Sequence, residues 1–225
     1  MPVFRLRSKL VFPDPELAED GLLAIGGDLS VERLLLAYRS GIFPGTAKAI
    51  PSSGGRHGAG PAQARAPAPV RPDPPQPASA PFEIRFDTAF EAVIGHCSRV
   101  PRPGQDGTWI TPEMQAAYVA LHRAGYAHSV EAWRDGELQG GLYGVSLGGA
   151  FFGESMFSLE PEASRAALAA LDARLAAWGF SLLDGQLPHE GLVGYGFQSV
   201  PRPLFLMELA LALKAGDRRG DWSER

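Results

Sequence analysis

Cysteine is almost absent from the sequence, and so are long apolar runs. Cys97 is the single cysteine, so it can form no internal disulfide and has no cysteine partners for a metal site. We expect it to be a small buried apolar side chain.

No apolar run approaches the roughly 20 residues that a membrane-spanning helix needs. The first residues, MPVFRLRSKLVFPDPE, lack the apolar core of a secretion signal. These absences predict a cytoplasmic protein without a membrane partner.

Positive charge is also scarce. Lys and Arg number 21 against 25 Asp and Glu, which gives a formal net charge of −4. Phosphate binding normally needs clustered Lys and Arg, so a protein that coats nucleic acid by bulk electrostatics is disfavoured. Any contact with nucleic acid should then be local. With 225 residues, 45% of them hydrophobic, the chain can bury the core of one domain or two small ones.

Residues 45–81 lack the side chains that build a core. The stretch contains no aromatic residue, and Ile50 and Val70 are its only large aliphatic residues. Such a composition cannot bury enough apolar surface to offset the entropy of ordering. As written, it predicts a disordered linker. We expect an N-terminal module over residues 1–80 and a second domain over residues 82–225.

Regular spacing of apolar residues predicts the remaining elements. Ser30 is a candidate N-cap, and Leu34, Leu35 and Tyr38 recur at helical spacing after it. A second helix is expected after Thr111 as N-cap and Pro112 at the first position. Asp135-Gly136 lies between two alternating runs and favours a β-hairpin. The predicted helices cover residues 31–40, 88–97, 111–124 and 163–178, and the predicted strands cover 82–86, 128–133, 138–147, 151–152 and 182–187. This order predicts an α+β or mixed α/β fold.

Five strings place polar residues or glycines within apolar stretches. They are GLLAIGGDLS (21–30), GTWIT (107–111), GGLYGV (140–145), FFGESMFS (151–158) and LLDGQ (182–186). In order and spacing the sequence resembles the bacterial leucyl/phenylalanyl-tRNA protein transferase family over residues 11–44 and 82–203. The resemblance implies an acyl-CoA N-acyltransferase (GNAT-type) fold for the second domain.

The resemblance also implies an activity. Members of this family transfer Leu or Phe, less often Met, from aminoacyl-tRNA to acceptor proteins that begin with Arg or Lys. The transfer marks the acceptor for degradation. It implies an aminoacyltransferase that needs no cofactor, and we expect a monomer.

Asp184 and Gln186 are two residues apart on a predicted strand, so their side chains point to the same face. A carboxylate that contacts an amide determines which way the amide oxygen faces, and that oxygen can accept a hydrogen bond from an incoming amine. The resemblance assigns this catalytic role to Gln186, with Asp184 behind it. A polar pair that faces solvent at the end of a strand is the alternative.

Glu154 lies between aromatic residues and Met156, where a carboxylate is costly to bury without a cationic partner. The acceptor's Arg or Lys can supply the cation, so Glu154 can hold the acceptor or share in proton transfer. A salt bridge within the protein, for example to Arg165, is the alternative reading.

Further residues are candidates for substrate binding. Tyr143, Phe152 and Met156 can line an apolar pocket for the donor side chain, although core packing explains them equally well. Trp109 can stack on a tRNA base. The helix N-terminus at Ser164 and Arg165 can meet a phosphate, with ordinary capping as the alternative. A lone histidine, His189, gives no metal site, and none is expected.

The sequence departs from the family pattern at three places. Gly185 stands where the family has Cys, and Tyr195-Gly196-Phe197 replaces a turn of small residues. After GIFP the family continues with an aromatic segment resembling WYSEGDPILWWSP, whose Trp residues belong to the donor site. Codons for residues 44–57, read one nucleotide earlier, can spell that segment, and codons for residues 62–80, read one nucleotide later, can spell a basic segment typical of the family. We hypothesise that residues 45–81 reflect a frameshift.

Two rival functions stay open at this point. An acetyl-CoA-dependent N-acetyltransferase would share the fold, but Gly148-Gly149-Ala150 runs into a predicted strand and does not open a helix as a pyrophosphate loop does. The second rival is an inactive tRNA-binding or peptide-binding remnant, since the Trp-rich donor segment is missing.

Overall fold

The computed structural model describes residues 4–18, 22–45, 56–58, 62–65, 82–100, 108–186 and 195–223. Within them the fold is mixed α/β, as the order of elements predicts. Most of the 45–81 stretch and His189 lie outside the described residues, so the predicted linker stays a prediction there. Two short strands of that stretch, β4 (Arg56–Gly58) and β5 (Ala62–Arg65), are described.

A large sheet forms the centre of the molecule. Its strand order is β11-β5-β10-β9-β8-β7-β6, and each of the four strands from β6 to β9 is antiparallel to its neighbours among them. β10 lies parallel to β9, so the chain must cross over before it enters β10. The further strands of this sheet are β6 (Glu83–Phe86), β7 (Ala127–Arg134), β8 (Glu137–Leu147), β9 (Ala150–Ser158), β10 (Leu182–Asp184) and β11 (Gln198–Val200).

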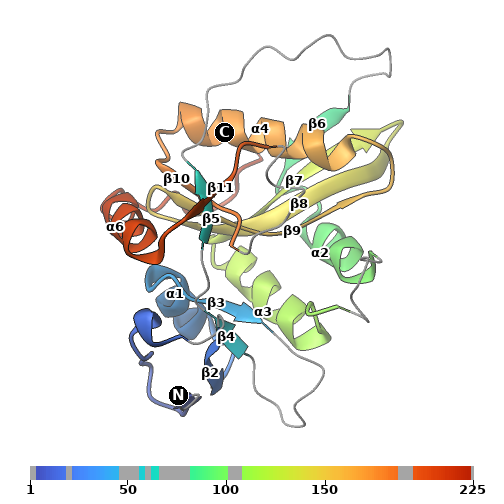
Figure 1. The fold of residues 1–225 in the computed structure, drawn as a ribbon. Coiled ribbons are helices and arrows are strands. Elements are labelled where there is room, and N and C mark those ends of the chain that lie inside the picture. Colours follow the sequence, from blue (N-terminus) through green and yellow to red (C-terminus); the bar gives the residue numbers. More distant parts are fainter. Residues whose placement is uncertain are drawn as a thin grey trace.

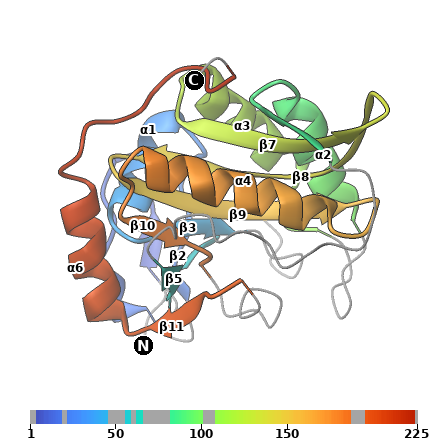
Figure 2. The same ribbon diagram turned by 90° about the horizontal axis from the view of Figure 1, so that it is seen from above.

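Helices cover both faces of this sheet. In Figure 1, α4 (Ala163–Ala177) lies along one face, and α2 (Phe90–Arg99) and α3 (Pro112–Arg123) lie on the other. α4 also makes the crossover from β9 to β10. α6 (Arg202–Ala212) follows β11 at the end of the sheet that carries β10, as Figure 2 shows from above. No helix in the described part of the chain is both long and apolar enough to cross a membrane.

A smaller sheet carries the N-terminal residues, in the order β1-β2-β4-β3. β1 (Phe4–Leu6) pairs in parallel with β2 (Leu22–Gly26), and β3 (Phe43–Gly45) follows α1 (Val31–Arg39). A single 3₁₀ turn, η1 (Pro15–Leu17), connects the first two strands. Helix α1 contacts both β3 of this sheet and α3, so it links the N-terminal residues to the central layer.

The local signals place the helices where the sequence predicts them. The Ser30 side chain accepts a hydrogen bond from the backbone N–H of Arg33 at the start of α1. The Thr111 side chain accepts one from the backbone N–H of Met114 at the start of α3. The predicted hairpin at Asp135-Gly136 is confirmed as β7 and β8. The predicted strand over residues 182–187 is too long, because β10 ends at Asp184.

Two cores lie on opposite faces of the large sheet. Along β8 and β9, Tyr143 and Phe152 face α1, α2 and α3, while Leu142 and Phe151 face α4. This alternation follows from the two-residue period of a strand. Cys97 is buried in the first core, in the apolar role expected of it.

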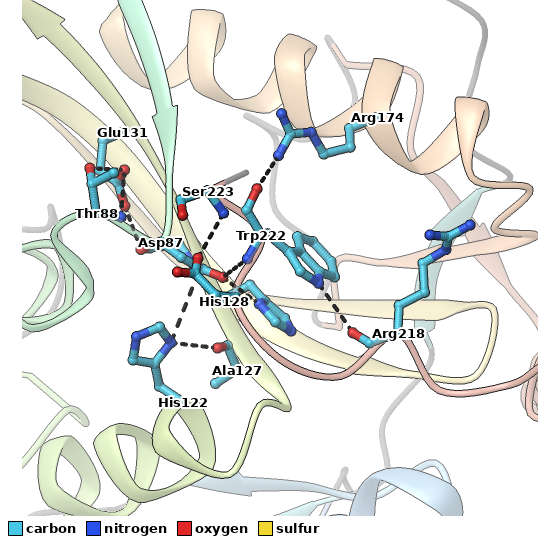
Figure 3. Close-up of polar contacts among 12 residues, drawn as sticks. Asp87, Thr88, His122, Ala127, His128, Glu131, Arg174, Arg218, Trp222 and Ser223 are labelled. Carbon is cyan, nitrogen blue, oxygen red and sulfur yellow. Dashed lines mark hydrogen bonds and ion pairs between the residues drawn. The ribbon is translucent and has the colours of Figure 1, made fainter. Parts of the chain in front are cut away.

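The C-terminal segment returns from α6 to the far edge of the sheet (Figure 2). The buried Trp222 ring stacks on His128 with ring centres 3.7 Å apart, and the Trp222 backbone N–H donates to Asp87 at 2.9 Å. Asp87 also contacts His128 Nδ1 at 2.8 Å (Figure 3). The last described residues are thus part of the second core.

Candidate active site

Glu154 lies at an irregularity in the pairing of β8 and β9. Tyr143 pairs with Ser155, but the next residue, Gly144, pairs with Gly153, so Glu154 is the extra residue of a β-bulge. A bulge changes the direction of a side chain and is frequent beside active sites. Here it leaves the Glu154 carboxylate on the side of the sheet that α1 and α3 cover.

The parallel register of β9 and β10 brings Gln186 to Glu154. Asp184, the last residue of β10, pairs with Phe152 on β9, and after the chain leaves the strand the Gln186 side chain reaches Glu154. The Gln186 Nε2 amide donates to Glu154 Oε1 at 2.5 Å. Residues that are 32 positions apart in the sequence therefore meet because β10 lies beside β9.

Two tyrosines complete the contacts of the Glu154 carboxylate. The Tyr38 hydroxyl, from α1, donates to Oε1 at 2.7 Å, and the Tyr118 hydroxyl, from α3, donates to Oε2 at 2.7 Å. Arg165, the internal partner considered for Glu154, pairs instead with Glu162 at 3.0 Å. Glu154 is thus held by neutral donors from α1, α3 and the end of β10.

Asp184 contacts Gln186 differently from the sequence expectation. Its Oδ1 accepts the backbone N–H of Gln186 at 2.7 Å, and it is Glu154 that contacts the Gln186 side-chain amide. The reason is local: the chain leaves β10 after Asp184, and Gln186 has a φ of +64°, so the two residues do not continue one strand. Asp184 determines the backbone position of Gln186, and Glu154 determines the direction of its amide.

Both carboxyl groups have raised pKa values. Burial raises the pKa of Glu154 to about 7, although its three hydrogen bonds act in the opposite direction. Burial also raises the pKa of Asp184 to about 7, and the nearby Glu154 charge adds to this shift. Two carboxyl groups that titrate near neutral pH in one place are typical of a site that handles protons.

The orientation of the Gln186 amide has a chemical consequence. Because its Nε2 points to Glu154, its Oε1 points away from that carboxylate and can accept a hydrogen bond. An amine placed against Oε1 would have a carboxyl group close to it. The site can therefore orient an amine nucleophile and take up or release one proton.

The candidate pocket residues divide between the two faces of the sheet. Tyr143 and Phe152 are buried in the first core, and Phe152 packs against Tyr38 with ring centres 5.1 Å apart. Met156 is half-buried and packs against the second core. The sheet therefore does not gather the three side chains on one face, and Tyr143 and Phe152 contribute to the first core.

The remaining candidates lie outside the Glu154 network. Trp109 is half-buried and packs against the first core. At the start of α4, the Ser164 N–H donates to the Ser158 hydroxyl at 2.9 Å, which is a capping contact. Arg165 stays at the surface, with Glu162 and the ring of Tyr195 as its neighbours.

Sequence reasoning missed Tyr38 and Tyr118 as site residues. Tyr38 was assigned to the apolar face of its helix, and its ring is indeed buried. The usable signal was its hydroxyl, because a buried tyrosine normally needs a hydrogen-bond partner. No pattern in the sequence states which partner that is.

Comparison with solved structures gives a weak match. The crystal structure of a functionally unknown conserved protein from Staphylococcus epidermidis covers 52% of this chain and 50% of its own, with 10% identity and a TM-score of 0.38. A similarity this low establishes no shared fold. The GNAT-type fold accordingly stays a prediction.

Comparison with sequences is decisive. The family model of the leucyl/phenylalanyl-tRNA protein transferase matches residues 76–210, and the model of its N-terminal domain matches residues 27–45. The leucyl/phenylalanyl-tRNA protein transferase of Myxococcus xanthus strain DK1622 is 50% identical over 231 residues, which cover 100% of this chain and 97% of the relative. The enzyme of Anaeromyxobacter sp. strain Fw109-5 is 48% identical, with coverage of 99% and 95%. The chain belongs to the leucyl/phenylalanyl-tRNA protein transferase family, a family of tRNA-dependent aminoacyltransferases that act on proteins.

Proposed function

We propose that this chain transfers Leu or Phe, less often Met, from aminoacyl-tRNA to the N-terminal Arg or Lys of acceptor proteins, which marks them for degradation. The reaction takes place in the cytoplasm, without a cofactor, on a monomer. The protein has a GNAT-type domain over residues 82–225 behind an N-terminal module over residues 1–80. The proposal rests on the orientation of the Gln186 amide. Its nitrogen donates a hydrogen bond to Glu154, and its oxygen takes no part in that contact.

The reaction needs orientation more than activation. The amino acid is joined to tRNA by an ester, whose carbonyl is already reactive, so a correctly placed amine supplies most of the required help. The amine nitrogen forms a bond to the carbonyl carbon, and the bond from that carbon to the ribose oxygen breaks. One proton leaves the nitrogen and one arrives at the ribose oxygen, so the overall balance is neutral.

The residues divide this work. Gln186 Oε1 accepts a hydrogen bond from the amine and directs its lone pair to the carbonyl carbon. Asp184 holds the backbone of Gln186 at 2.7 Å, so that a residue with positive φ keeps one position. Glu154 orients the amide, exchanges a proton with the reacting groups, and carries the charge that an acceptor's Arg or Lys can pair with.

The test is single-turnover transfer of labelled Phe from its tRNA to an Arg-initiated peptide. Gln186→Ala should lower the rate by roughly a hundredfold or more, the usual scale for a positioned proton acceptor. Asp184→Ala should have a similar effect, and Asp184→Asn, which keeps an acceptor oxygen, a smaller one. Glu91→Gln, an exposed carboxylate on α2, is the matched control.

Affinity for charged tRNA separates chemistry from binding. It should barely change in the Gln186 and Asp184 variants. A loss of affinity equal to the loss of rate would move both residues to donor binding and contradict the proposed mechanism. The double variant should lose little more than the worse single variant, because residues that act as one unit are non-additive.

Two further assays test the rival functions. Turnover of acetyl-CoA by the chain would favour an N-acetyltransferase. If the chain transfers no amino acid while a version that carries the Trp-rich reading of residues 45–81 does, the chain as written is an inactive remnant. Contacts of Tyr143, Phe152 and Met156 with the donor side chain, and of Trp109, Ser164 and Arg165 with tRNA, stay predictions.

A further inference from the structure

Tyr38 and Tyr118 reach Glu154 from two different helices with little freedom to move. Both rings are buried, with 1% and 0% of their surface exposed. Tyr38 packs against Phe152, and Tyr118 packs edge-on against Tyr143 with ring centres 5.3 Å apart. Because the rings are held by the core, the positions of the two hydroxyl oxygens are determined before any substrate arrives.

These two hydroxyls and the carboxyl group of Glu154 form a closed triangle. Tyr38 Oη is 2.7 Å from Glu154 Oε1, Tyr118 Oη is 2.7 Å from Oε2, and the two Oη atoms are 2.5 Å apart. Three oxygen-to-oxygen contacts at hydrogen-bond distance need three hydrogens. The two phenols supply one hydrogen each.

The count determines where the third hydrogen belongs. If Glu154 is ionised, both phenolic hydrogens point to the carboxylate, and the short contact between the two hydroxyl oxygens contains no hydrogen. If Glu154 is protonated on Oε2, its hydrogen points to Tyr118 Oη, the Tyr118 hydrogen points to Tyr38 Oη, and the Tyr38 hydrogen points to Oε1. The Tyr118 hydroxyl then accepts from Glu154, and it donates to the carboxylate only when Glu154 is ionised. Gln186 Nε2 already donates to Oε1, so Oε2 is the oxygen better placed to carry the proton.

We propose that Tyr38 and Tyr118 are positioning residues that hold Glu154 in a closed ring of three hydrogen bonds, with Glu154 protonated when no substrate is bound. The inference rests on the proposed role of Glu154 in transfer. When an acceptor's cation arrives, the proton of Glu154 leaves to water. Both phenols then donate to the carboxylate, and the hydrogen bond between the tyrosines is broken.

The groups around Glu154 also favour its protonated form. Asp184, at the end of β10, is a second carboxyl group close to Glu154, and two such groups disfavour each other's ionisation: the Glu154 charge raises the pKa of Asp184. Burial raises the pKa of both tyrosine hydroxyls well above the usual value, so each stays a donor across the neutral range. Among the described residues, the titratable groups that face the site from the surrounding elements are Tyr38 on α1, Tyr118 on α3, Tyr143 on β8 and Asp184.

The experiment uses infrared difference spectra of the full chain, without substrates. Wild type minus Glu154→Gln should show the carbonyl band of a protonated carboxyl group at about pH 6, and the band should disappear as the pH rises through about 7 to 8. Tyr38→Phe removes the donor to Oε1, so the carbonyl band should move to higher frequency. Tyr126→Phe, a half-buried tyrosine outside the site, should leave the band unchanged.

Thermal stability provides a second, independent readout. A Gln side chain at position 154 has one acceptor oxygen and an N–H donor, so it reproduces the three-hydrogen ring. The Tm of Glu154→Gln should match wild type at about pH 6 and exceed it at about pH 8.5, where wild type must ionise Glu154 above its raised pKa of about 7. Absence of the carboxyl band, or a Tm of Glu154→Gln below wild type at about pH 6, would overturn the ring.

Transfer assays distinguish this inference from the proposed function. Tyr38→Phe and Tyr118→Phe should each lower the single-turnover rate roughly tenfold to a hundredfold, the scale of one hydrogen bond to a charged group. In the Glu154→Gln background, Tyr118→Phe should cost little more, since it acts through Glu154. Wild-type transfer by Glu154→Gln would refute the proposed role of Glu154, while the infrared band would still decide whether the ring exists. A wild-type rate in both tyrosine variants would refute their positioning role.

Discussion

At the scale of single residues, the site contains acids that folding makes harder to ionise. Asp184 is 4% exposed, and its partner in the described contacts is a backbone N–H and not a cation. A carboxylate in such surroundings loses the solvation that water gives its charge. The protein accepts this cost where two acids are needed close to one amide, so the stability of the fold and the chemistry of the site are linked.

Asp184 should therefore make the protein less stable as the pH rises. Its pKa is about 7 in the folded protein against 3.8 ordinarily, so the folded state keeps a proton that the unfolded state has lost. The contribution to stability is complete below about pH 4 and is lost as the pH rises through about 7. Asp184→Asn cannot ionise, so its stability relative to wild type should rise between about pH 5 and pH 8 by a few kcal/mol, at about 1.4 kcal/mol per pKa unit.

Urea unfolding at both pH values measures this difference. Asp135→Asn, in the exposed turn between β7 and β8, is the matched substitution. If the stability gap between Asp184→Asn and wild type is the same at both pH values, Asp184 does not change its ionisation on folding.

At the scale of elements, the turn between α3 and β7 is tied to the C-terminal segment. Gly125 has a φ of +79°, and its carbonyl accepts the N–H of Gly220 at 3.2 Å. A Cβ atom at Gly125 would lie 2.5 Å from that nitrogen. Close approach of two backbones, as well as the turn itself, thus requires glycine here. Three residues further on, the His128 ring stacks on the Trp222 ring.

Two glycines with the same backbone conformation test that packing. Gly125 and Gly136 have φ values of +79° and +80°, but nothing lies within 4 Å of a Cβ atom at Gly136. Gly136→Ala should cost about 1 kcal/mol, the strain of left-handed backbone. Gly125→Ala should cost about 1–3 kcal/mol more, because the C-terminal segment must also move.

Denaturant unfolding of both variants gives the two costs. Removal of the residues after 216 from each variant should bring the two costs close together, because the backbone at Gly220 that a Cβ atom at position 125 would contact is then gone. Equal costs in the full-length variants would show that the C-terminal segment is free to move away from the turn.

At the scale of the whole molecule, the N-terminal residues and the catalytic sheet share one site. Helix α1 contributes Leu34 and Tyr38 to the first core, and Tyr38 contacts Glu154 on β9. The buried Arg33 of the same helix binds the carbonyl of Arg7 and the carboxylate of Asp28, which attaches the small sheet to the helix. Damage to the segment that joins these parts would therefore affect the site directly.

The gene offers a test of the joining segment. We expect resequencing of the codons for residues 44–81 to reveal a frame that encodes Trp-Trp-Ser-Pro after GIFP. The restored text would also add basic residues, which favours contact with tRNA phosphates. A read that confirms the present text would refute the frameshift, and rapid protease cleavage between Gly45 and Pro81 is then the expected behaviour of a disordered linker.

Sequence alone determined the elements whose signals are local. Ser30 and Thr111 marked the starts of two helices, Asp135-Gly136 marked the hairpin, and the alternation along residues 138–147 predicted a strand. Such signals depend on residues within a few positions of each other, so they act before distant parts of the chain meet. The β1, β2 and α6 elements went unpredicted, because short strands and a helix that is apolar on several sides give weak periodic patterns.

The contacts of the site were decided by the tertiary structure. The sequence identified Glu154, Asp184 and Gln186 as residues of interest, yet it paired Asp184 with the wrong part of Gln186 and gave Glu154 no tyrosine partners. The register of β9 and β10, one bulge at Glu154 and the packing of α1 and α3 placed these groups together. Strand register and helix packing depend on the whole core at once, and for that reason no short stretch of sequence specifies them.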